Sequence, residues 1–240
     1  MLNQQLQQLR LSGALQALQR QNEQPGHYQE LTFDERLSLL LSHELTVREQ
    51  RKVARLIKQA KFRLQAHPEQ VNYQIERGLP KSQFRSLLEG HWLTHFQNLL
   101  FTGATGCGKT WLACAIGHHL CQQGIPVRYY RLKTLLVQLL KVHGDGSYSR
   151  FLNQLTQTPV LILDDWGMES LNTQQRSDLL DIIDARHGQA STIIASQLPV
   201  DCWHELIGEA TYADAIMDRL IHRAERLDLK GESMRKREKN

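Results

Sequence analysis

The stretch GATGCGKT, residues 103–110, decides the fold of this chain. It matches the spacing G-x-x-x-x-G-K-[ST] at every fixed position. Glycines at this spacing let the backbone wrap around a phosphate, with N–H groups pointing inward and the positive end of a helix dipole behind them. An ordinary glycine turn is the alternative, so the flanking elements must decide between the two interpretations.

The flanking elements favour a phosphate-binding loop. FQNLLFTG, residues 96–103, is typical of a strand that ends in the turn, and residues 111–123 are typical of a helix. In this context Lys109 would reach the β- and γ-phosphates of ATP, and the Thr110 hydroxyl would ligate Mg²⁺. The predicted nucleotide-binding residues are Gly103, Ala104, Thr105, Gly106, Cys107, Gly108, Lys109, Thr110 and Trp111.

Strands and helices continue to alternate beyond this loop. The patterns predict strands over 125–131, 159–165 and 191–197, and helices over 132–142 and 173–186. The strands are continuous apolar runs, which is typical of strands buried on both faces. We therefore predict an α/β fold, with a parallel sheet between layers of helices.

Two adjacent carboxylates end one of these strands. In LILDDWG, residues 161–167, Asp164 occupies the position from which a carboxylate reaches the magnesium, usually through water. Asp165 occupies the position that orients the attacking water in many ATP-hydrolysing members of this fold. The alternative for Asp165 is a turn residue or a helix cap. The doublet favours hydrolysis of ATP over transfer to a small metabolite by a kinase.

Further candidates follow downstream. STIIASQ ends in Ser196 and Gln197, polar groups placed to sense the γ-phosphate or to position the water. Arg219 lies on a predicted helix, where it could stabilise charge on the ATP of a neighbouring subunit. The alternative is an ordinary surface arginine, paired with Asp214 or Asp218.

The first part of the chain, residues 1–95, shows helical patterns and no strand-like alternation. A first helix is predicted over 3–21, before the break QPGH at 24–27. Thr32 and Glu35 form the pattern of a capping box that begins a second helix.

A basic helical face is predicted over residues 47–64. One side of this segment carries apolar residues at helical spacing, namely Val53, Leu56, Ile57, Ala60 and Leu64. The opposite side carries Arg48, Arg51, Lys52, Arg55 and Lys58, with Lys61 and Arg63 beside them. Such a row of cations is either a solvated surface or a contact surface for a nucleic-acid backbone.

Composition excludes several classes of protein. The 240 residues are 41% apolar, enough for a sizeable core, but the apolar runs are short and the first residues lack the apolar segment of a signal peptide. We therefore expect a cytoplasmic protein without a membrane partner. The four cysteines show no CxxC spacing, which predicts reduced thiols, and Cys107 stands at a variable loop position. The net charge of +4 says little about partners.

Several long stretches together resemble one family. They are LRLSGALQAL, YQELTFDERLSLLLSHE, GATGCGKT, LILDDWG, STIIASQLPVDCWHE and AIMDRLIHRAERLDLKGESMRKR, which cover nearly the whole chain. In these stretches the chain resembles the IstB-like helper ATPases of insertion-sequence transposition. That family is similar in turn to the DnaC-type helicase loaders of the AAA+ superfamily.

The resemblance implies an AAA+ P-loop ATPase domain over 96–240 and an all-helical domain for DNA binding and oligomerisation over 1–95. It also implies a homo-oligomer that assembles with ATP and Mg²⁺ on duplex DNA and helps to deliver a transposase. Asp165 would activate the water, Gln197 would be the polar sensor, and Arg219 would reach a neighbour's ATP. The basic face then becomes a candidate DNA contact.

Two departures from the wider superfamily stand out. Many AAA+ ATPases carry Glu at the position of Asp165, and the shorter side chain predicts slow or partner-dependent hydrolysis. Residues 197–240 are too few for the usual helical lid domain, so Arg235 is a weak candidate for a second sensor. The basic tail at 235–239 is either a DNA contact or disordered.

Two alternative functions share the same fold. The chain could load a replicative helicase, or it could be a DNA scaffold that ATP holds together with negligible hydrolysis. The pair of helices around LTFDERLSLLLSHE favours transposition, because it resembles that family.

Overall fold

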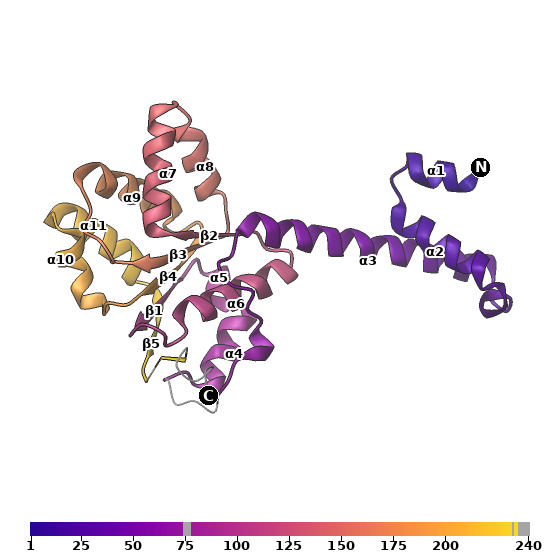
Figure 1. Cartoon of the computed structure of the whole chain (residues 1–240), viewed down its shortest axis with the longest axis horizontal. Coiled ribbons are helices and arrows are strands. Elements are labelled where there is room, and N and C mark those ends of the chain that lie inside the picture. Colours follow the sequence, from indigo (N-terminus) through magenta and orange to yellow (C-terminus); the bar gives the residue numbers. More distant parts are fainter. Residues whose placement is uncertain (74–77, 232, 235–240) are drawn as a thin grey trace. The chain divides into compact units, whose positions relative to one another are not determined.

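The computed structural model describes residues 1–73, 78–231 and 233–234 (Figure 1). The chain divides into two compact units, Met1–Arg55 and Leu56–Asn240. Each unit has helices of its own, and all strands in the described residues belong to the second.

The first unit begins with two short helices, α1 (Leu2–Gln8) and α2 (Ser12–Glu23), followed by a 3-10 turn at Pro25–Tyr28. The single helix predicted over 3–21 is therefore wrong. The chain breaks between α1 and α2, where Arg10 has a left-handed backbone with φ of 56°.

A buried carboxylate accounts for this break. Glu44 Oε2 accepts hydrogen bonds from the backbone N–H groups of Gly13 and Ala14, at 2.6 and 3.1 Å. These amides belong to the first turn of α2, where N–H groups have no partner within the helix. Gly13 permits the close approach, since a Cβ there would lie 2.8 Å from the Glu44 Cα atom.

The long helix α3 (Phe33–Ala60) follows. The predicted capping box begins it: Thr32 N donates to Glu35 Oε2 at 2.8 Å, and Glu35 N donates to Thr32 Oγ1 at 3.3 Å. The hydrogen bonds that Thr32 donates to the Glu35 carboxylate, from its backbone N–H and then from its hydroxyl, lower the pKa of Glu35. The helix was predicted to reach Leu64, but it ends at Ala60 because Lys61 turns the backbone with a φ of 57°.

The second unit is an α/β fold with a five-stranded sheet of order β2-β3-β4-β1-β5, in which every pair of neighbouring strands is parallel. The strands are β1 (Asn98–Gly103), β2 (Val127–Arg131), β3 (Val160–Trp166), β4 (Ser191–Ser196) and β5 (Ala224–Leu229). The helices are α4 (Lys81–Glu89), α5 (His91–Thr94), α6 (Lys109–Gln122), α7 (Leu132–Gly144), α8 (Tyr148–Thr156), α9 (Thr173–Arg186), α10 (Trp203–Ile207) and α11 (Ala210–Ile221). Two 3-10 turns lie at Pro68–Gln70 and Val200–Cys202. The predicted parallel sheet is confirmed.

Helices cover both faces of the sheet (Figure 1). Leu99 and Ile162 point to the face that packs against α6, while Leu100 and Leu161 point to the face covered by α7, α8, α9, α10 and α11. Neighbouring residues of a strand point to opposite faces, so each strand contributes to both cores. This double burial explains the continuous apolar runs.

The unit boundary differs from the predicted domain boundary at 95/96. Residues that follow Arg55 share a core with α6, since Leu56, Ala60, Phe84 and Trp92 are buried in the same cluster as α6 and β1. The segment before β1 is helical, as predicted, but it packs as part of the second unit.

Within the described residues, β5 is followed by no helical lid domain. Arg235 and the tail at 235–239 lie outside the described residues. No helix in the described part of the chain is long and apolar enough to cross a membrane.

Candidate nucleotide-binding site

The glycine-rich loop connects β1 to the first turn of α6. Gly103, Gly106 and Gly108 have φ values of 134°, 88° and 97°, a region that residues with a side chain rarely adopt. Close contacts add a second constraint, because a Cβ at Gly103 would collide with the Leu229 carbonyl oxygen of β5. The loop therefore turns its backbone around a small concave space in front of α6, as the motif predicted.

Lys109 lies inside this loop. Its ammonium group donates to the carbonyl oxygens of Gly103 and Ala104, at 2.6 and 2.8 Å, and the residue is 7% exposed. Burial lowers the pKa of Lys109, while the charges of Asp164 and Asp165 act in the opposite direction. These two hydrogen bonds hold the Lys109 ammonium beside the loop that the motif assigns to phosphate binding.

Thr110 and Asp164, the two residues predicted to hold Mg²⁺, are in direct contact. The Thr110 hydroxyl lies 3.0 and 2.9 Å from the two carboxylate oxygens of Asp164, and Tyr129 OH donates to Asp164 Oδ2 at 2.6 Å. Burial, followed by the hydrogen bond to Asp164, raises the pKa of Tyr129, so the phenol stays a donor. A hydroxyl and a carboxylate side by side are oxygen ligands of the type that Mg²⁺ prefers.

A bulge in β3 brings Asp165 to the same side. The register between β3 and β4 shifts between Leu163 and Trp166, and Asp165 has a left-handed backbone with φ of 55°. In a regular strand the side chains of Asp164 and Asp165 would point to opposite faces of the sheet. The bulge turns the second carboxylate so that both line one pocket.

Two arginines hold Asp165. Arg131 Nε, at the end of β2, donates to Asp165 Oδ2 at 2.7 Å, and Arg63 Nη1 lies 3.5 Å from the same oxygen. The hydrogen bond to Asp165 raises the pKa of Arg131. Neither arginine was predicted as a site residue. The position of Arg131 at the carboxyl end of a predicted parallel strand was a usable signal, since such ends meet at one edge of the sheet.

These groups line a pocket of about 1090 Å³ at the carboxyl ends of the strands. The predicted site residues that line it are Thr105, Gly106, Gly108, Lys109, Thr110, Trp111, Asp164, Asp165 and Gln197. Gln197 Oε1 accepts a hydrogen bond from Thr105 Oγ1 at 2.6 Å.

The side chains of the candidate sensor Ser196 and of the loop residue Cys107 make contacts away from the pocket. Ser196 Oγ donates to the Trp166 carbonyl oxygen at 3.0 Å and is fully buried. The buried Cys107 thiol lies 3.7 Å from the Gly231 carbonyl oxygen. Both contacts are internal to the fold.

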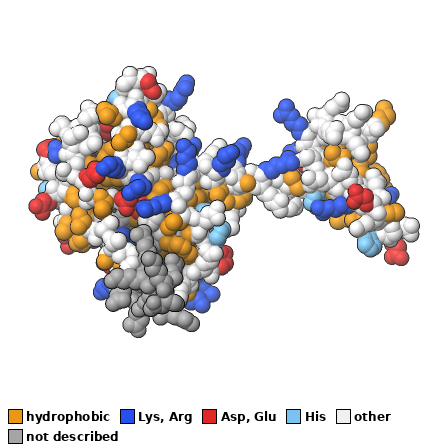
Figure 2. Space-filling view, viewed as in Figure 1, with side chains coloured by type: hydrophobic (Ala, Val, Ile, Leu, Met, Phe, Trp, Pro, Cys, Tyr) orange, Lys and Arg blue, Asp and Glu red, His pale blue; other side chains and the backbone are white. Residues whose placement is uncertain are grey.

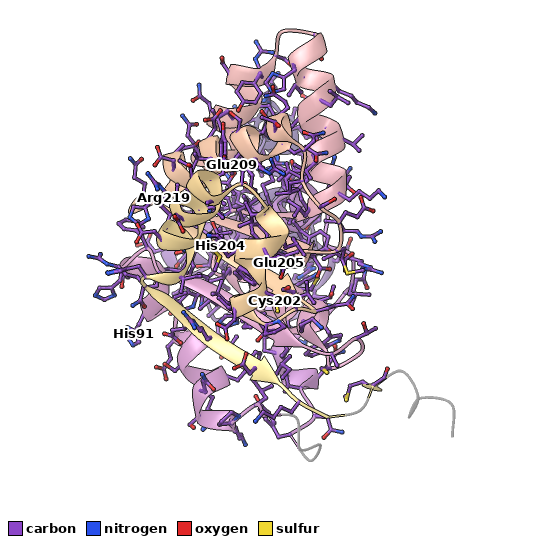
Figure 3. All side chains as sticks on the ribbon, turned by 90° about the vertical axis from the view of Figure 1, so that its left-hand side faces the viewer. His91, Cys202, His204, Glu205, Glu209 and Arg219 are labelled. Carbon is purple, nitrogen blue, oxygen red and sulfur yellow. The ribbon has the colours of Figure 1, made fainter. Side chains whose placement is uncertain are left out.

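Arg219 is not among the residues that line this pocket. It lies on α11, on the side that faces the viewer in Figure 3. Its guanidinium pairs with Asp184 at 2.5 Å and donates to the Ala215 carbonyl oxygen at 2.9 Å. The partner is therefore neither of the two aspartates that the sequence suggested.

The predicted basic face is exposed, and basic side chains lie along α3 in Figure 2. Its members Arg48, Arg51, Lys52, Arg55 and Lys58 are all exposed. Arg48 pairs with Glu44 at 2.7 Å, and no ion pair engages the other four within the described residues. Their charges are therefore not neutralised by described side chains.

The sequence matches a known family over almost its full length. The profile of the family described as IstB-like ATP binding protein matches residues 4–240. A putative insertion sequence ATP-binding protein of Sinorhizobium fredii is 49% identical over 214 residues, covering 89% of this chain and 87% of that protein. The putative ATP-binding protein of insertion sequence IS1162 from Pseudomonas fluorescens is 48% identical over 196 residues, covering 81% and 84%.

The fold matches solved structures of other proteins. A crystal structure of the DnaC helicase loader has 27% sequence identity and a TM-score of 0.55, covering 62% of this chain and 87% of that one. A crystal structure of DnaI has 20% identity and a TM-score of 0.60, covering 69% and 92%. The second likeness shows the fold alone.

Proposed function

The chain belongs to the IstB-like ATP-binding protein family of the AAA+ type, and on this premise we propose that it is an ATP-hydrolysing helper of DNA transposition. In this proposal it oligomerises on duplex DNA, hydrolyses ATP to ADP and phosphate, and recruits or stimulates a transposase at target DNA. One observation carries the catalytic part, namely the contact between Thr110 of the glycine-rich loop and Asp164 of β3.

The binding step uses groups that lie together in the pocket. The loop N–H groups and the Lys109 ammonium would hold the β- and γ-phosphates. Thr110 and Asp164 would hold Mg²⁺, the latter directly or through water, and the ion would offset the negative charge of the phosphates. The contact between Thr110 and Asp164, and the hydrogen bond that Tyr129 OH donates to Asp164, support this assignment.

The hydrolytic step falls to Asp165. Its carboxylate would orient the attacking water and accept its proton as the oxygen approaches the γ-phosphorus. Gln197 directly follows β4, where its amide could contact the same water or the γ-phosphate. The shared pocket of Asp165, Gln197 and Lys109 supports this division of roles.

Arg219 would act on the ATP of a neighbouring subunit. Arg219 does not line the nucleotide pocket of its own subunit, and its side chain is 30% exposed. To reach a neighbour it would exchange Asp184 for the γ-phosphate, a partner of higher charge.

The basic face on α3 would contact the phosphate backbone of DNA. Four of its exposed cations have no ion-pair partner within the described residues, so binding DNA would break no internal pair at those positions. Backbone contacts carry no sequence information directly, so we expect little sequence preference from this face. A role on chromosomal DNA implies a cytoplasmic location.

A helicase loader is the second candidate, because the DnaC helicase loader is a structural neighbour with 27% identity. The two functions differ in the partner. Tagged protein with ATP, Mg²⁺ and duplex DNA should retain an insertion-sequence transposase and should not retain a replicative helicase. Retention of the helicase alone would reject the transposition proposal.

A DNA scaffold with negligible hydrolysis is the third candidate. It predicts oligomers on DNA that form with ATP and persist without phosphate release. The carboxylate of Asp165, directed into the pocket, favours hydrolysis over this candidate.

A further inference from the structure

The pocket extends beyond the groups that would hold the phosphates, on two flanks of the glycine-rich loop. On one flank the lining comes from α7 and from the segment after β3, and it includes Val137 and Met168. Elsewhere the lining includes Gln70, Trp111 and Met234. A nucleotide whose phosphates lie at the loop therefore has two directions in which its base can extend.

The order of the strands decides between these directions. Because the sheet runs β2-β3-β4-β1-β5, the loop after β1 lies between the end of β3, which carries Asp165, and β5. A γ-phosphate beside Asp165 places the rest of the nucleotide on the other side of the loop, toward β5. Met234 lies on that side, since it follows β5 and its N–H donates to the Gly106 carbonyl oxygen at 3.0 Å.

The segment that carries Gln70 runs from the end of β3 to β5. Before Gln70 in the sequence, Arg63 Nη1 lies 3.5 Å from Asp165 Oδ2. After Gln70, a Cβ at Gly78 would lie 2.8 Å from the Asp228 carbonyl oxygen of β5. Gln70 lies between these two points in the sequence and lines the pocket. It is therefore a candidate contact for a base that extends from the loop toward β5.

The side-chain amide of Gln70 has a defined orientation. Its Oε1 atom accepts a hydrogen bond from the His67 backbone N–H at 3.3 Å, as part of the capping box of the 3-10 turn Pro68–Gln70. Pro68 and Val71 are both buried, which anchors this turn. Because the amide oxygen is engaged, the NH2 group is the part of the amide that is left for a ligand, and it can only donate.

We propose that Gln70 is a specificity-determining residue, which selects adenine over guanine by donating a hydrogen bond to N1 of the base. N1 of adenine accepts a hydrogen bond, whereas N1 of guanine carries a hydrogen and would face the amide donor to donor. Trp111 and Met234 offer apolar surface that any purine can use, so the choice between purines falls to the polar edge. This inference rests on the proposed function, since it concerns the base of the nucleotide that the site would hydrolyse.

The competing role for Gln70 is purely structural, as the cap of the 3-10 turn. The two roles predict different results for a variant that lacks the amide. Loss of the cap weakens the binding of all purine nucleotides by the same factor. Loss of a group that reads the base changes the ratio between nucleotides, because only adenine loses a hydrogen bond.

The test measures dissociation constants with Mg²⁺ for the full chain and for two variants of Gln70. The probes are ATP, GTP, ITP and 1-deaza-ATP, in which a C–H group replaces N1. The unaltered chain should bind ATP about fivefold or more tightly than each of the other three. ITP has the N1–H of guanine without its 2-amino group, so its weak binding would exclude the bulk of that group as the cause.

The two variants should change this preference in different ways. Gln70→Met has no donor and should bind ATP, GTP and 1-deaza-ATP within about twofold of one another. Gln70→Glu keeps one oxygen for the His67 N–H and offers the other as an acceptor for guanine N1–H, so it should prefer GTP to ATP. Gln65→Glu is the matched control for the added charge, because Gln65 is exposed, belongs to the same segment and is not among the described residues that line the pocket. It should keep the ATP-to-GTP ratio of the unaltered chain.

The proposal is overturned if Gln70→Met weakens ATP and GTP by the same factor, or if the unaltered chain binds 1-deaza-ATP or ITP as tightly as ATP. If neither variant of Gln70 folds, the binding of 1-deaza-ATP and ITP to the unaltered chain decides alone. Failure of the proposed function looks different: the chain would then bind ATP with this base preference but release no phosphate and retain no transposase.

Discussion

Asp164 and Asp165 are consecutive residues of β3, yet both carboxylates face the Arg63 guanidinium, at 3.8 and 3.5 Å. A bulge between Leu163 and Trp166 and a left-handed Asp165 backbone create this relationship. One strand end can therefore present one carboxylate to a metal and the other to water.

We predict that the two aspartates can be separated by substitution. Asp165→Asn should bind ATP with about the affinity of the unaltered chain and lose nearly all hydrolysis, since Asn tolerates the left-handed backbone but accepts no proton. Asp164→Asn should weaken nucleotide binding in the presence of Mg²⁺ and change it little in EDTA, because Asp164 would contact the nucleotide only through the metal ion. Fluorescent-nucleotide titrations with and without Mg²⁺ measure both effects.

Equal loss of ATP binding in the two variants would show that the aspartates form one metal site. Thermal unfolding without nucleotide is the control for a folding defect, which would lower the melting temperature of either variant.

The basic face should bind DNA through charge. Changing Arg51, Lys52 and Arg55 to Glu should weaken binding to duplex DNA and flatten the dependence of log K on log salt by about 0.9 for each DNA phosphate that the face no longer neutralises. The matched control exchanges Lys and Arg at these three positions and keeps the charge. Anisotropy titrations at several salt concentrations supply the slopes, and an unchanged slope in the Glu variant would make the face a solvated surface.

Arg219 should act between subunits. Arg219→Ala should lose hydrolysis because the neighbour's ATP lacks the guanidinium. Lys109→Ala should lose hydrolysis because the ATP phosphates lack the ammonium group. Mixing the two variants should restore part of the activity, because sites with an intact Lys109 can receive Arg219 from a neighbour. Phosphate release across mixing ratios provides the measurement, and a mixture as inactive as its components argues against a shared site.

Tyr129 should support Asp164 and give a pH-dependent signature. Tyr129→Phe removes a buried donor to a carboxylate and should cost about 2 kcal/mol in the free energy of unfolding near pH 7. The pKa of Tyr129 is raised in the folded state, so above about pH 10 the unfolded chain loses this proton first and stability falls. The variant lacks this dependence on pH.

Urea unfolding at neutral and alkaline pH provides the test of the Tyr129 account. The stability difference between the unaltered chain and Tyr129→Phe should narrow above about pH 10. A difference that stays constant or widens would mean that the phenol is not held protonated by its surroundings.

Local signals in the sequence predicted much of the fold and the centre of the site. The strands β1, β3 and β4 have apolar runs because both of their faces are buried, whereas the edge strand β2 (VRYYR) is buried on one face only. The glycine-rich loop has fixed spacing because its backbone needs positive φ values. Strand β5 was missed because only Leu227 and Leu229 of its residues are buried, which leaves no such run.

Features that depend on distant residues could not be predicted. The break between α1 and α2 is stabilised by Glu44, which follows Gly13 by 31 residues. The charge pattern predicted Arg63 beside the basic face of a helix, but the left-handed turn at Lys61 ends the helix and places Arg63 near the carboxylates. The bulge that turns Asp165 arises from pairing between β3 and β4. The local sequence LILDDWG does not predict this pairing.

The release of phosphate from ATP, measured with and without duplex DNA, tests the central claim most directly. The account predicts a slow rate that duplex DNA raises, and Asp165→Asn should abolish that rate while ATP binding is retained. A rate that is the same with and without DNA, or a stimulated rate that persists in Asp165→Asn, would contradict it.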